Sequence, residues 1–330
     1  MQVLIPAGGQ GTRLRPLTLR IPKPLLPLGT APILTHILKG VPAGVTAVPI
    51  ITPGLVGPFQ SWQTTLNGRT RVELFVEEPD REAPGPVAGL LQCLRSRAVA
   101  EDVVIVMGDS VLPFSLDEFA PRDRDHASAR LAAYRLPAGE DASRFGVLEV
   151  TSGGRLASFQ EKPASPRSNL VFTGCLYLPA RLVPQLLQCD PSRMPQMGDM
   201  VSELDRLGEP VDVFEVRGEW HDIGTFSSYL AAHRPLLDQA RLEALRVEGC
   251  VVEGTVYVHP EARAIRSHLR DTVLWRGAEV SDSDLTQCIV EVGVQVRGTR
   301  ANASHFGLPA GADTGRALSG SPNIPTPYGH

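Results

Sequence analysis

The sequence lacks several features that would have narrowed its class. Its 330 residues contain no apolar run near the roughly 20 residues that a membrane-spanning helix needs, so we expect no membrane partner. Its five cysteines are far apart and form no Cys-x-x-Cys pair, which argues against a zinc site and against a disulfide framework. The basic and apolar regions of a secretory signal are also missing from the opening residues. We therefore expect a cytoplasmic protein with reduced thiols.

A surplus of positive charge is absent as well. Lys and Arg number 32 against 36 Asp and Glu, which gives a formal net charge of −4. Extended binding to nucleic acid needs excess cations that neutralise phosphates, so we expect no nucleic-acid partner. The composition is 42% hydrophobic and 21% charged, as in ordinary globular proteins with a core. A small basic pocket is compatible with this balance.

Apolar runs alternate with helical patterns in the first part of the chain. Continuous apolar runs are typical of parallel strands that are buried on both faces, and their alternation with helices predicts a layered α/β sheet. Between residues 129 and 159, shorter strands separated by turns predict an antiparallel insertion. The expected strands are 3–5, 45–51, 72–76, 103–107 and 211–216, and the expected helices are 33–38, 87–98, 181–187, 199–207 and 226–240.

The pattern changes near residue 247. Short β-type pieces recur there at a spacing close to six residues, and glycines such as Gly254, Gly277 and Gly293 separate them. Each such piece needs neighbours to bury its apolar edge, so the segment predicts a short left-handed β-helix of degenerate hexapeptide repeats. Residues 301–330 are rich in Gly, Pro, Ala, Ser and Thr, and we expect a disordered tail there.

A glycine-rich stretch from Gly8 to Thr18 follows the first apolar run. Glycines after a strand let backbone N–H groups approach a phosphate closely, and the nearby cations Arg13, Arg15 and Lys23 suit a triphosphate. No Gly-Lys-Ser/Thr ending follows, which excludes a P-loop. Leu14 stands where a dinucleotide fingerprint needs its third glycine. The remaining alternative is a plain glycine turn, which has little use for so much positive charge.

This stretch, with Lys23-Pro24-Leu25-Leu26-Pro27 after it, resembles the opening motif of the sugar-1-phosphate nucleotidyltransferases, also called nucleotide-sugar pyrophosphorylases. Every fixed position of G-G-x-G-T-R-L-x-P-L-T…K-P-x-x-P is matched. The resemblance implies a loop that binds the nucleoside triphosphate and two catalytic cations, Arg13 and Lys23. The implied nucleotide-binding residues are Ala7, Gly8, Gly9, Gly11, Thr12 and Arg13.

Two separated aspartates are candidates for a metal site. Asp109 follows a long apolar run, at the kind of strand end where ligands of α/β sheets gather, although it could instead cap the next turn. Asp222 lies in Trp220-His221-Asp222-Ile223-Gly224-Thr225, which is similar to the W-x-D-x-G-T segment of the family. The resemblance implies that both carboxylates hold Mg²⁺ beside the triphosphate.

Phe159-Gln160-Glu161-Lys162-Pro163 is similar to the F-x-E-K-P motif of the family. The resemblance implies that Glu161 accepts sugar hydroxyls and that Lys162 holds the sugar phosphate, whereas without it the pair reads as solvated loop charge. Gly146 and Thr173 fall where the family lines its sugar pocket, although turn and strand packing explain them nearly as well. The stretch 77–89 is expected to contact the base, and it departs from the subgroup patterns of the family.

The resemblance implies transfer of a nucleoside monophosphate from an NTP to a sugar-1-phosphate, with release of pyrophosphate. It favours dTTP and glucose-1-phosphate, as in glucose-1-phosphate thymidylyltransferases; mannose-1-phosphate guanylyltransferase is the alternative. A non-catalytic nucleotide-sugar sensor on the same fold would be expected to lose a motif Arg, Lys or Asp. The expected parts are a catalytic domain at 1–240, a β-helix at 241–300 that serves oligomer contacts rather than acyl transfer, and the tail. We expect a homo-oligomer.

Overall fold

The structure is a computed structural model that describes residues 1–78, 85–121, 128–237 and 247–307. The chain divides into two compact units. The first unit contains Met1–Gln10, Lys23–Leu25 and Ile33–Asp222, and the second contains Gly11–Pro22, Leu26–Pro32 and the chain from Ile223 onward. The signature stretch near the N-terminus is therefore shared between the units.

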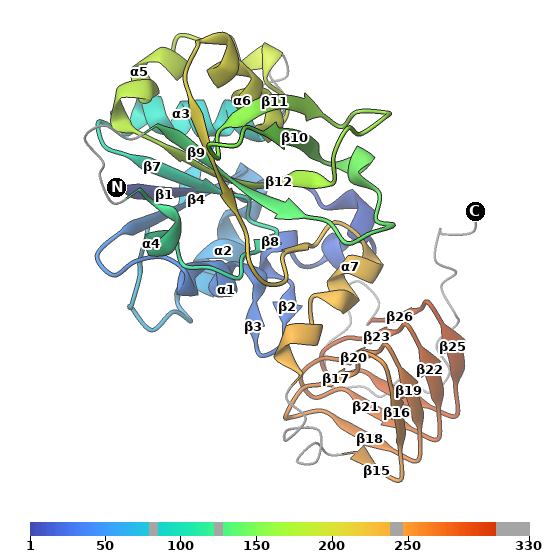
Figure 1. The fold of residues 1–330 in the computed structure, drawn as a ribbon. Coiled ribbons are helices and arrows are strands. Elements are labelled where there is room, and N and C mark those ends of the chain that lie inside the picture. Colours follow the sequence, from blue (N-terminus) through green and yellow to red (C-terminus); the bar gives the residue numbers. More distant parts are fainter. Residues whose placement is uncertain (79–84, 122–127, 238–246, 308–330) are drawn as a thin grey trace. The chain divides into compact units, whose positions relative to one another are not determined.

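A ten-stranded mixed sheet forms the centre of the first unit. Its main path runs β11–β10–β12–β7–β1–β4–β5, with β6 beside β4, β9 beside β12 and β13 beside β9 (Figure 1). This arrangement confirms the predicted layered α/β sheet. The strands are β1 (Gln2–Pro6), β4 (Thr46–Ile51), β5 (Arg71–Val72), β6 (Phe75–Val76), β7 (Val103–Val106), β9 (Ala129–Arg135), β10 (Gly146–Val150), β11 (Leu156–Glu161), β12 (Leu170–Leu178) and β13 (Val211–Glu215).

Strand direction divides this sheet into two regions. Strands β7, β1, β4 and β6 are mutually parallel neighbours, so their carboxyl ends meet at one edge. Strands β9, β10, β11 and β12 pair antiparallel with one another, as the insertion predicts, and β12 joins them to β7. The single strand expected at 72–76 is two short strands, β5 and β6, which pair with opposite ends of β4.

Helices cover both faces of the sheet (Figure 1). On one face lie α3 (Pro86–Ser96), α5 (Val183–Leu186) and α6 (Met197–Arg206), whose apolar side chains form one buried cluster with the sheet. On the other lie α1 (Ile33–Lys39), α2 (Val56–Gln63) and α4 (Leu116–Phe119). Short 3-10 turns connect these elements: η3 (Lys23–Leu25), η4 (Pro53–Leu55), η5 (Ala142–Arg144), η6 (Ala180–Leu182) and η7 (Pro191–Arg193).

The second unit joins a hairpin, a helix and a β-helix. The hairpin is β2 (Pro27–Leu28) and β3 (Ala31–Pro32), and the helix is α7 (Phe226–Ala231). The Tyr229 hydroxyl, from α7, donates to the Pro27 carbonyl and accepts from Trp275 Nε1 at 3.0 Å, so one buried side chain links all three parts. Helix α7 is shorter than predicted because the turn η8 (Arg234–Leu236) contains Pro235, which cannot continue a helix; residues 238–240 lie outside the described residues.

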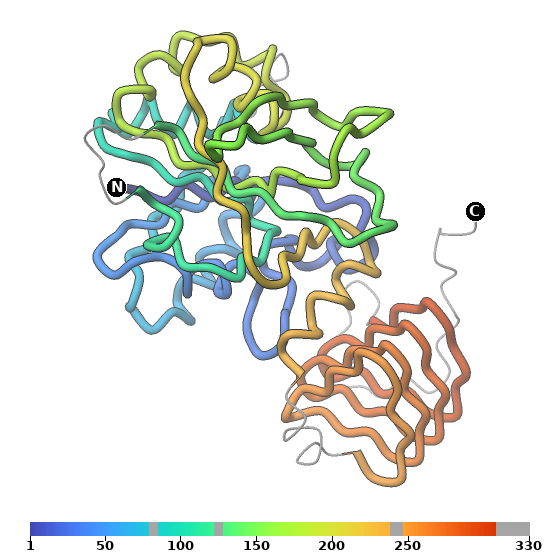
Figure 2. Tube along the Cα trace, viewed as in Figure 1, coloured from blue at the N-terminus to red at the C-terminus, as the bar shows by residue number. Residues whose placement is uncertain are grey.

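The predicted β-helix is present, and its coils stack through three parallel four-stranded sheets (Figure 2). His268 pairs with Asp284, and Asp284 pairs with Arg300, so one coil contains 16 residues. Three hexapeptides would give a longer coil, so the repeats are shorter on average than six residues. The strands are β15 (Val247–Glu248), β16 (Val251–Glu253), β17 (Tyr257–Val258), β18 (Arg263–Ile265), β19 (His268–Arg270), β20 (Val273–Leu274), β21 (Glu279–Ser281), β22 (Asp284–Thr286), β23 (Ile289–Val290), β24 (Gln295–Arg297), β25 (Arg300–Asn302) and β26 (His305–Phe306).

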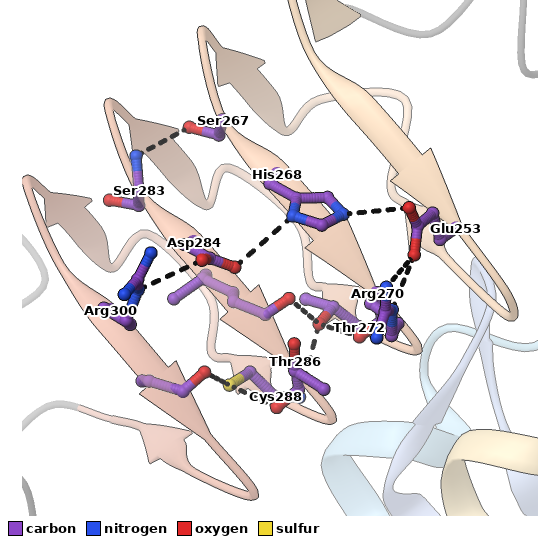
Figure 3. A network of polar contacts seen from close by, with 12 residues as sticks. Glu253, Ser267, His268, Arg270, Thr272, Ser283, Asp284, Thr286, Cys288 and Arg300 are labelled. Atoms are coloured by element: carbon purple, nitrogen blue, oxygen red, sulfur yellow. Dashed lines mark hydrogen bonds and ion pairs between the residues drawn. The ribbon is translucent and has the colours of Figure 1, made fainter.

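Inward and outward positions of the β-helix differ in character. Leu269, Leu285 and Ala301 form a buried ladder inside, and charged residues alternate on the outside of the same sheet. There His268 lies between Glu253 and Asp284, at 3.4 and 3.5 Å (Figure 3). The inner ladder explains why β25 and β26 continue to Phe306, beyond the expected boundary at residue 300: one more coil buries the apolar edge of the coil before it.

Candidate active site

A cavity of about 290 Å³ lies at the carboxyl-end edge of the four parallel strands. Segments that follow β1, β6 and β7 supply most of its walls, with Ile50 near the end of β4, as expected for a ligand site of an α/β sheet. All of the lining residues belong to the first unit. They are Pro6, Ala7, Gly8, Gly9, Gln10, Lys23, Pro24, Ile50, Glu77, Gly85, Pro86, Met107, Gly108 and Asp109.

Lys23 and Asp109 form an ion pair in this cavity. Lys23 Nζ lies 2.5 Å from Asp109 Oδ2, and the two side chains are 11% and 25% exposed. Asp109 comes two residues after Met107, where β7 has ended, and Gly108 keeps the turn close to β1 because its N–H donates to the Pro6 carbonyl. A largely buried ammonium beside a carboxylate is suited to bind phosphate oxygens and to balance their charge.

A two-stranded ribbon holds Asp222 near the segment that carries Asp109. Strands β8 (Ser110–Val111) and β14 (His221–Asp222) pair antiparallel, with Asp222 opposite Ser110. Opposed residues of such a pair have Cα atoms about 5 Å apart, so Asp222 is a neighbour of the residue that follows Asp109. The ribbon thus brings the backbone of Asp222 beside the segment that carries Asp109, although more than a hundred residues separate the two in the sequence; Asp222 is not among the residues that line the cavity.

These two carboxylates fit a hard divalent cation. Mg²⁺ is usually bound by one or two carboxylates, with waters and substrate phosphates completing its octahedron. Within the described ranges, no cluster of three or more His, Cys, Asp or Glu side chains could hold a metal alone. The donor set therefore suits Mg²⁺ that arrives with a phosphorylated substrate better than a permanently bound transition metal.

The signature glycines have separate positions. Ala7, Gly8 and Gly9 line the cavity, and a Cβ on Gly8 would lie 2.9 Å from Glu77 Oε1, so only glycine fits there without displacement. Gly11, with φ +59°, precedes the 3-10 turn η1 (Thr12–Leu14) in the second unit, and the Thr18 hydroxyl donates to its carbonyl at 2.8 Å. A second turn, η2 (Leu17–Leu19), follows.

Two more predicted residues, Thr12 and Arg13, belong to this second part of the loop, and their side chains are exposed. Ala7, Gly8 and Gly9 therefore line the same cavity as the Lys23–Asp109 pair. Thr12 and Arg13 belong to the second unit.

Glu161 and Lys162 lie at the end of β11. Gly146 is the register partner of Glu161 on β10, and a Cβ on Gly198 of α6 would lie only 1.8 Å from Glu161 Oε2. Burial raises the pKa of the Glu161 carboxyl, partly offset by the ammonium of Lys162, whose Nζ is 3.4 Å from Glu161 Oε1. Lys162 Nζ also donates to Gln196 Oε1 at 2.8 Å.

Thr173 is buried in β12, and its hydroxyl donates to the Ala132 carbonyl at 3.0 Å. This bond fixes the rotamer of the threonine within the sheet and leaves the lone pairs of its oxygen as acceptors.

Three residues near these groups were not singled out from the sequence. Gln196 holds Lys162, and Gly198 makes room for Glu161. Glu77 lines the cavity within the stretch expected to contact the base. The sequence signals for Glu77 are this stretch and its position directly after an apolar strand. Gln196 and Gly198 carry no such signal, because their roles come from the packing of α6 on β11.

Comparisons with known proteins identify the family of this chain. A family model described as nucleotidyl transferase matches residues 2–239. The glucose-1-phosphate thymidylyltransferase of Streptomyces antibioticus is 26% identical over 291 residues, which cover 86% of this chain and 80% of that protein. Its counterpart from Streptomyces griseus is 27% identical over 293 residues, with the same coverage. The bifunctional protein GlmU of Methanococcus aeolicus is 26% identical over 266 residues, 78% of this chain and 60% of that protein.

A solved structure shares the fold. A Bacillus anthracis protein assigned as a glucose-1-phosphate thymidylyltransferase, crystallised with sucrose, superposes with a TM-score of 0.60 at 23% identity and covers 71% of this chain and 94% of its own. No described helix is long and apolar enough to cross a membrane. The family model matches well over half of this chain, so the chain belongs to the nucleotidyl transferase family. It is a sugar-1-phosphate nucleotidyltransferase, an enzyme of nucleotide-sugar biosynthesis.

Proposed function

We propose that this enzyme transfers a nucleoside monophosphate from a nucleoside triphosphate to glucose-1-phosphate. An anionic oxygen of the sugar phosphate attacks the α-phosphorus of the triphosphate. The bond from that phosphorus to the bridging oxygen breaks, and pyrophosphate leaves with the electron pair. The products are a nucleotide-sugar and pyrophosphate. The observation that carries the proposal is the buried Lys23–Asp109 pair at the strand ends, with Asp222 on the adjoining ribbon.

The chain's own groups act by positioning and electrostatics, since the nucleophile is already anionic and needs no strong base. Backbone N–H groups of Gly8 and Gly9 bind the nucleotide, because these glycines line the cavity without side chains. The ammonium of Lys23 balances the charge that develops at the α-phosphate. By the resemblance of the signature motif, Arg13 and the backbone of Gly11 and Thr12 hold the departing pyrophosphate.

We propose that Asp109 and Asp222 hold the Mg²⁺ on which activity depends. The ion neutralises part of the triphosphate charge when it is bound. Asp109 also fixes the Nζ of Lys23 by direct contact, so this carboxylate orients a cation of the protein as well as a ligand. Asp222, anchored by the β8–β14 ribbon, contributes a second oxygen donor from a rigid position.

The sugar phosphate is assigned to the site around Glu161. Its carboxylate can accept two sugar hydroxyls, and the ammonium of Lys162, steadied by Gln196, can hold the phosphate. Gly146, opposite Glu161 in the sheet, contributes to the sugar site by leaving room for the Glu161 carboxylate, since a Cβ there would lie 3.1 Å from Glu161 Oε2 and 2.4 Å from Phe159 Cζ. The oxygen of Thr173 supplies a further acceptor.

Two donors are candidates. The activity named for the two Streptomyces relatives favours dTTP, which would make the product dTDP-glucose. The carboxylate of Glu77 in the cavity favours GTP, as in mannose-1-phosphate guanylyltransferases. Because members of the family are typically cytoplasmic oligomers, we expect a cytoplasmic homo-oligomer. Size-exclusion chromatography with light scattering measures the oligomeric state directly.

Pyrophosphate release tests the reaction. The enzyme is incubated with each of five NTPs and with glucose-1-phosphate or mannose-1-phosphate, in Mg²⁺ and in EDTA. We expect turnover with one sugar phosphate and its loss in EDTA. Asp109→Asn and Asp222→Asn are each expected to lower turnover by roughly 100-fold, because a metal site contributes several kcal/mol to the transition state.

Asp117→Asn, on the exposed surface of α4, is the matched control and should retain full turnover. Near-normal turnover of either site variant, with an unchanged melting temperature, would contradict the assignment of the metal.

A further inference from the structure

Glu77 occupies a distinctive position in the cavity. It follows β6 directly, and its backbone N–H donates to the Ile51 carbonyl, which fixes the start of its side chain. The carboxylate then lies over two glycines from different segments. A Cβ on Gly8 would be 2.9 Å from Glu77 Oε1, and a Cβ on Gly89 would be 1.7 Å from Glu77 Oε2. The chain therefore leaves space for this carboxylate on both sides.

Among the described residues, no cation accounts for this placement. Throughout the part of the chain that the structure describes, the Glu77 carboxylate has neither an ion pair nor a hydrogen-bond donor. Burial alone raises the pKa of this carboxyl, without an opposing charge. A half-buried acceptor without donors is costly to a fold, so its presence in a ligand cavity points to donors that the ligand supplies.

The order of the strands indicates which part of the nucleotide this is. Along the edge the order is β7, β1, β4 and β6, so Asp109 after β7 and Glu77 after β6 are three strand spacings apart, about 14 Å. The Lys23–Asp109 pair marks the phosphate end. A nucleotide that lies along the edge with its phosphates there carries its base toward Glu77. Ile50 and Pro86 supply apolar surface in the same cavity for the faces of a base.

We infer that Glu77 reads the nucleobase and selects guanine, so that GTP is the preferred donor. An ionised carboxylate can only accept hydrogen bonds, and guanine presents two adjacent donors, N1–H and the N2 amino group, which match its two oxygens. Thymine and uracil present a single N3–H between two carbonyl oxygens, which the second carboxylate oxygen would repel. Adenine and cytosine place an acceptor nitrogen beside the amino donor. This assignment deepens the proposed nucleotidyl transfer and rests on it.

The first test compares donors on the wild-type enzyme. With the better sugar phosphate at saturation, kcat/KM is measured by pyrophosphate release for GTP, ITP, dTTP, UTP, ATP and CTP. We expect GTP to be the best donor, about 10- to 100-fold above dTTP, the range that one bidentate base contact supplies. ITP, which lacks the N2 amino group, should fall between them.

The second test changes the carboxylate. Glu77→Gln keeps the size of the side chain and offers one acceptor and one donor, the pattern that thymine and uracil complement. We expect this variant to lose about 10- to 100-fold in kcat/KM with GTP and to gain with dTTP, so that the preference narrows or reverses. Glu118→Gln, an exposed glutamate on α4, is the matched control and should leave all donor preferences unchanged.

The outcomes separate the two proposals. Turnover in which dTTP equals or exceeds GTP, or in which ITP equals GTP, overturns the reading of guanine and leaves nucleotidyl transfer standing. Unchanged preferences in Glu77→Gln overturn it as well. Absence of pyrophosphate release with every donor and both sugar phosphates overturns the proposed function itself. The comparison of ITP with GTP needs no variant, so it decides the matter even where Glu77→Gln fails to fold.

Discussion

The substitution Gly198→Ala would add one methyl group to the helix that lies beside Glu161. The added Cβ would lie 1.8 Å from Glu161 Oε2 and 2.9 Å from Phe159 Cζ. Ordinary contacts of a Cβ are 3.4 Å or longer, so the carboxylate would have to move by more than 1 Å. Because the carboxylate is the far end of a flexible side chain, this movement is possible without disturbing the backbone of α6.

The expected effects on stability and on activity therefore differ in size. The helix propensity of alanine exceeds that of glycine by up to about 1 kcal/mol in a helix interior and by less in the first turn, where Gly198 lies. This gain offsets part of the cost of moving the Glu161 and Phe159 side chains, so the variant should remain close to the wild type in stability. A displaced carboxylate loses its hydrogen bonds to the sugar. One hydrogen bond to a charged group contributes about 2 kcal/mol, which corresponds to roughly 30-fold in kcat/KM for the sugar phosphate.

Steady-state kinetics with each substrate varied in turn measures this effect. We expect a 30-fold loss for the sugar phosphate and an unchanged KM for the nucleoside triphosphate, since Gly198 does not line the nucleotide cavity. Gly57→Ala is the control: Gly57 lies in α2 with no atom within 4 Å of the added Cβ. If Gly198→Ala kept its kcat/KM within twofold of the wild type, the placement of the sugar against Glu161 would be refuted.

Two further predictions concern the same pair of sites. Gln196→Ala removes the acceptor of Lys162 and should raise KM for the sugar phosphate about tenfold, the contribution of one charge-assisted hydrogen bond. Gln196→Glu restores an acceptor and should return KM most of the way to the wild-type value. Equal KM values for both variants would contradict this role. Burial raises the pKa of Glu77, so the folded state binds its proton more tightly than the unfolded state does, and ionisation destabilises the fold as pH rises above the ordinary carboxyl value of 4.5. Glu77→Gln should consequently melt at a higher temperature than the wild type at pH 8, with the difference vanishing as pH falls below 4.5; a difference that is the same across this range in differential scanning fluorimetry would contradict the linkage.

The elements that the sequence predicts best are those with a continuous apolar signal. β7 and the turn to Asp109 follow directly from such a run, and the signature motif predicts the glycine loop and Lys23. β12 was not predicted, although its nine residues are all buried. The reason lies in Gly174, which adopts φ +79° and coincides with a shift in the pairing of β12 with β9. The glycine therefore indicates a local turn in the sequence, although the strand continues through it.

The convergence of Asp109 and Asp222 depended on a different kind of information. β14 is only two residues long, and its propensity alone could not have defined a strand. It exists because β8 offers it a partner, and that pairing is what brings Asp222 opposite Ser110, the residue after Asp109. The sequence could identify Asp222 only through the resemblance of its segment to a family motif, whereas the register that makes it a neighbour of Asp109 is a tertiary feature.

Glu77 and Glu161, which we propose as contacts to the base and to the sugar, are harder to identify from the sequence than the glycine loop. Each carboxylate lies against two glycines from other segments, Gly8 and Gly89 in one case and Gly146 and Gly198 in the other. Burial raises the pKa of both, so each charge is held at a cost to stability that a ligand's donors can offset. A glycine far away in the chain gives no local sign that it makes room for a carboxylate. Residues that bind the base and the sugar are therefore visible only once the strands and α6 are assembled around them.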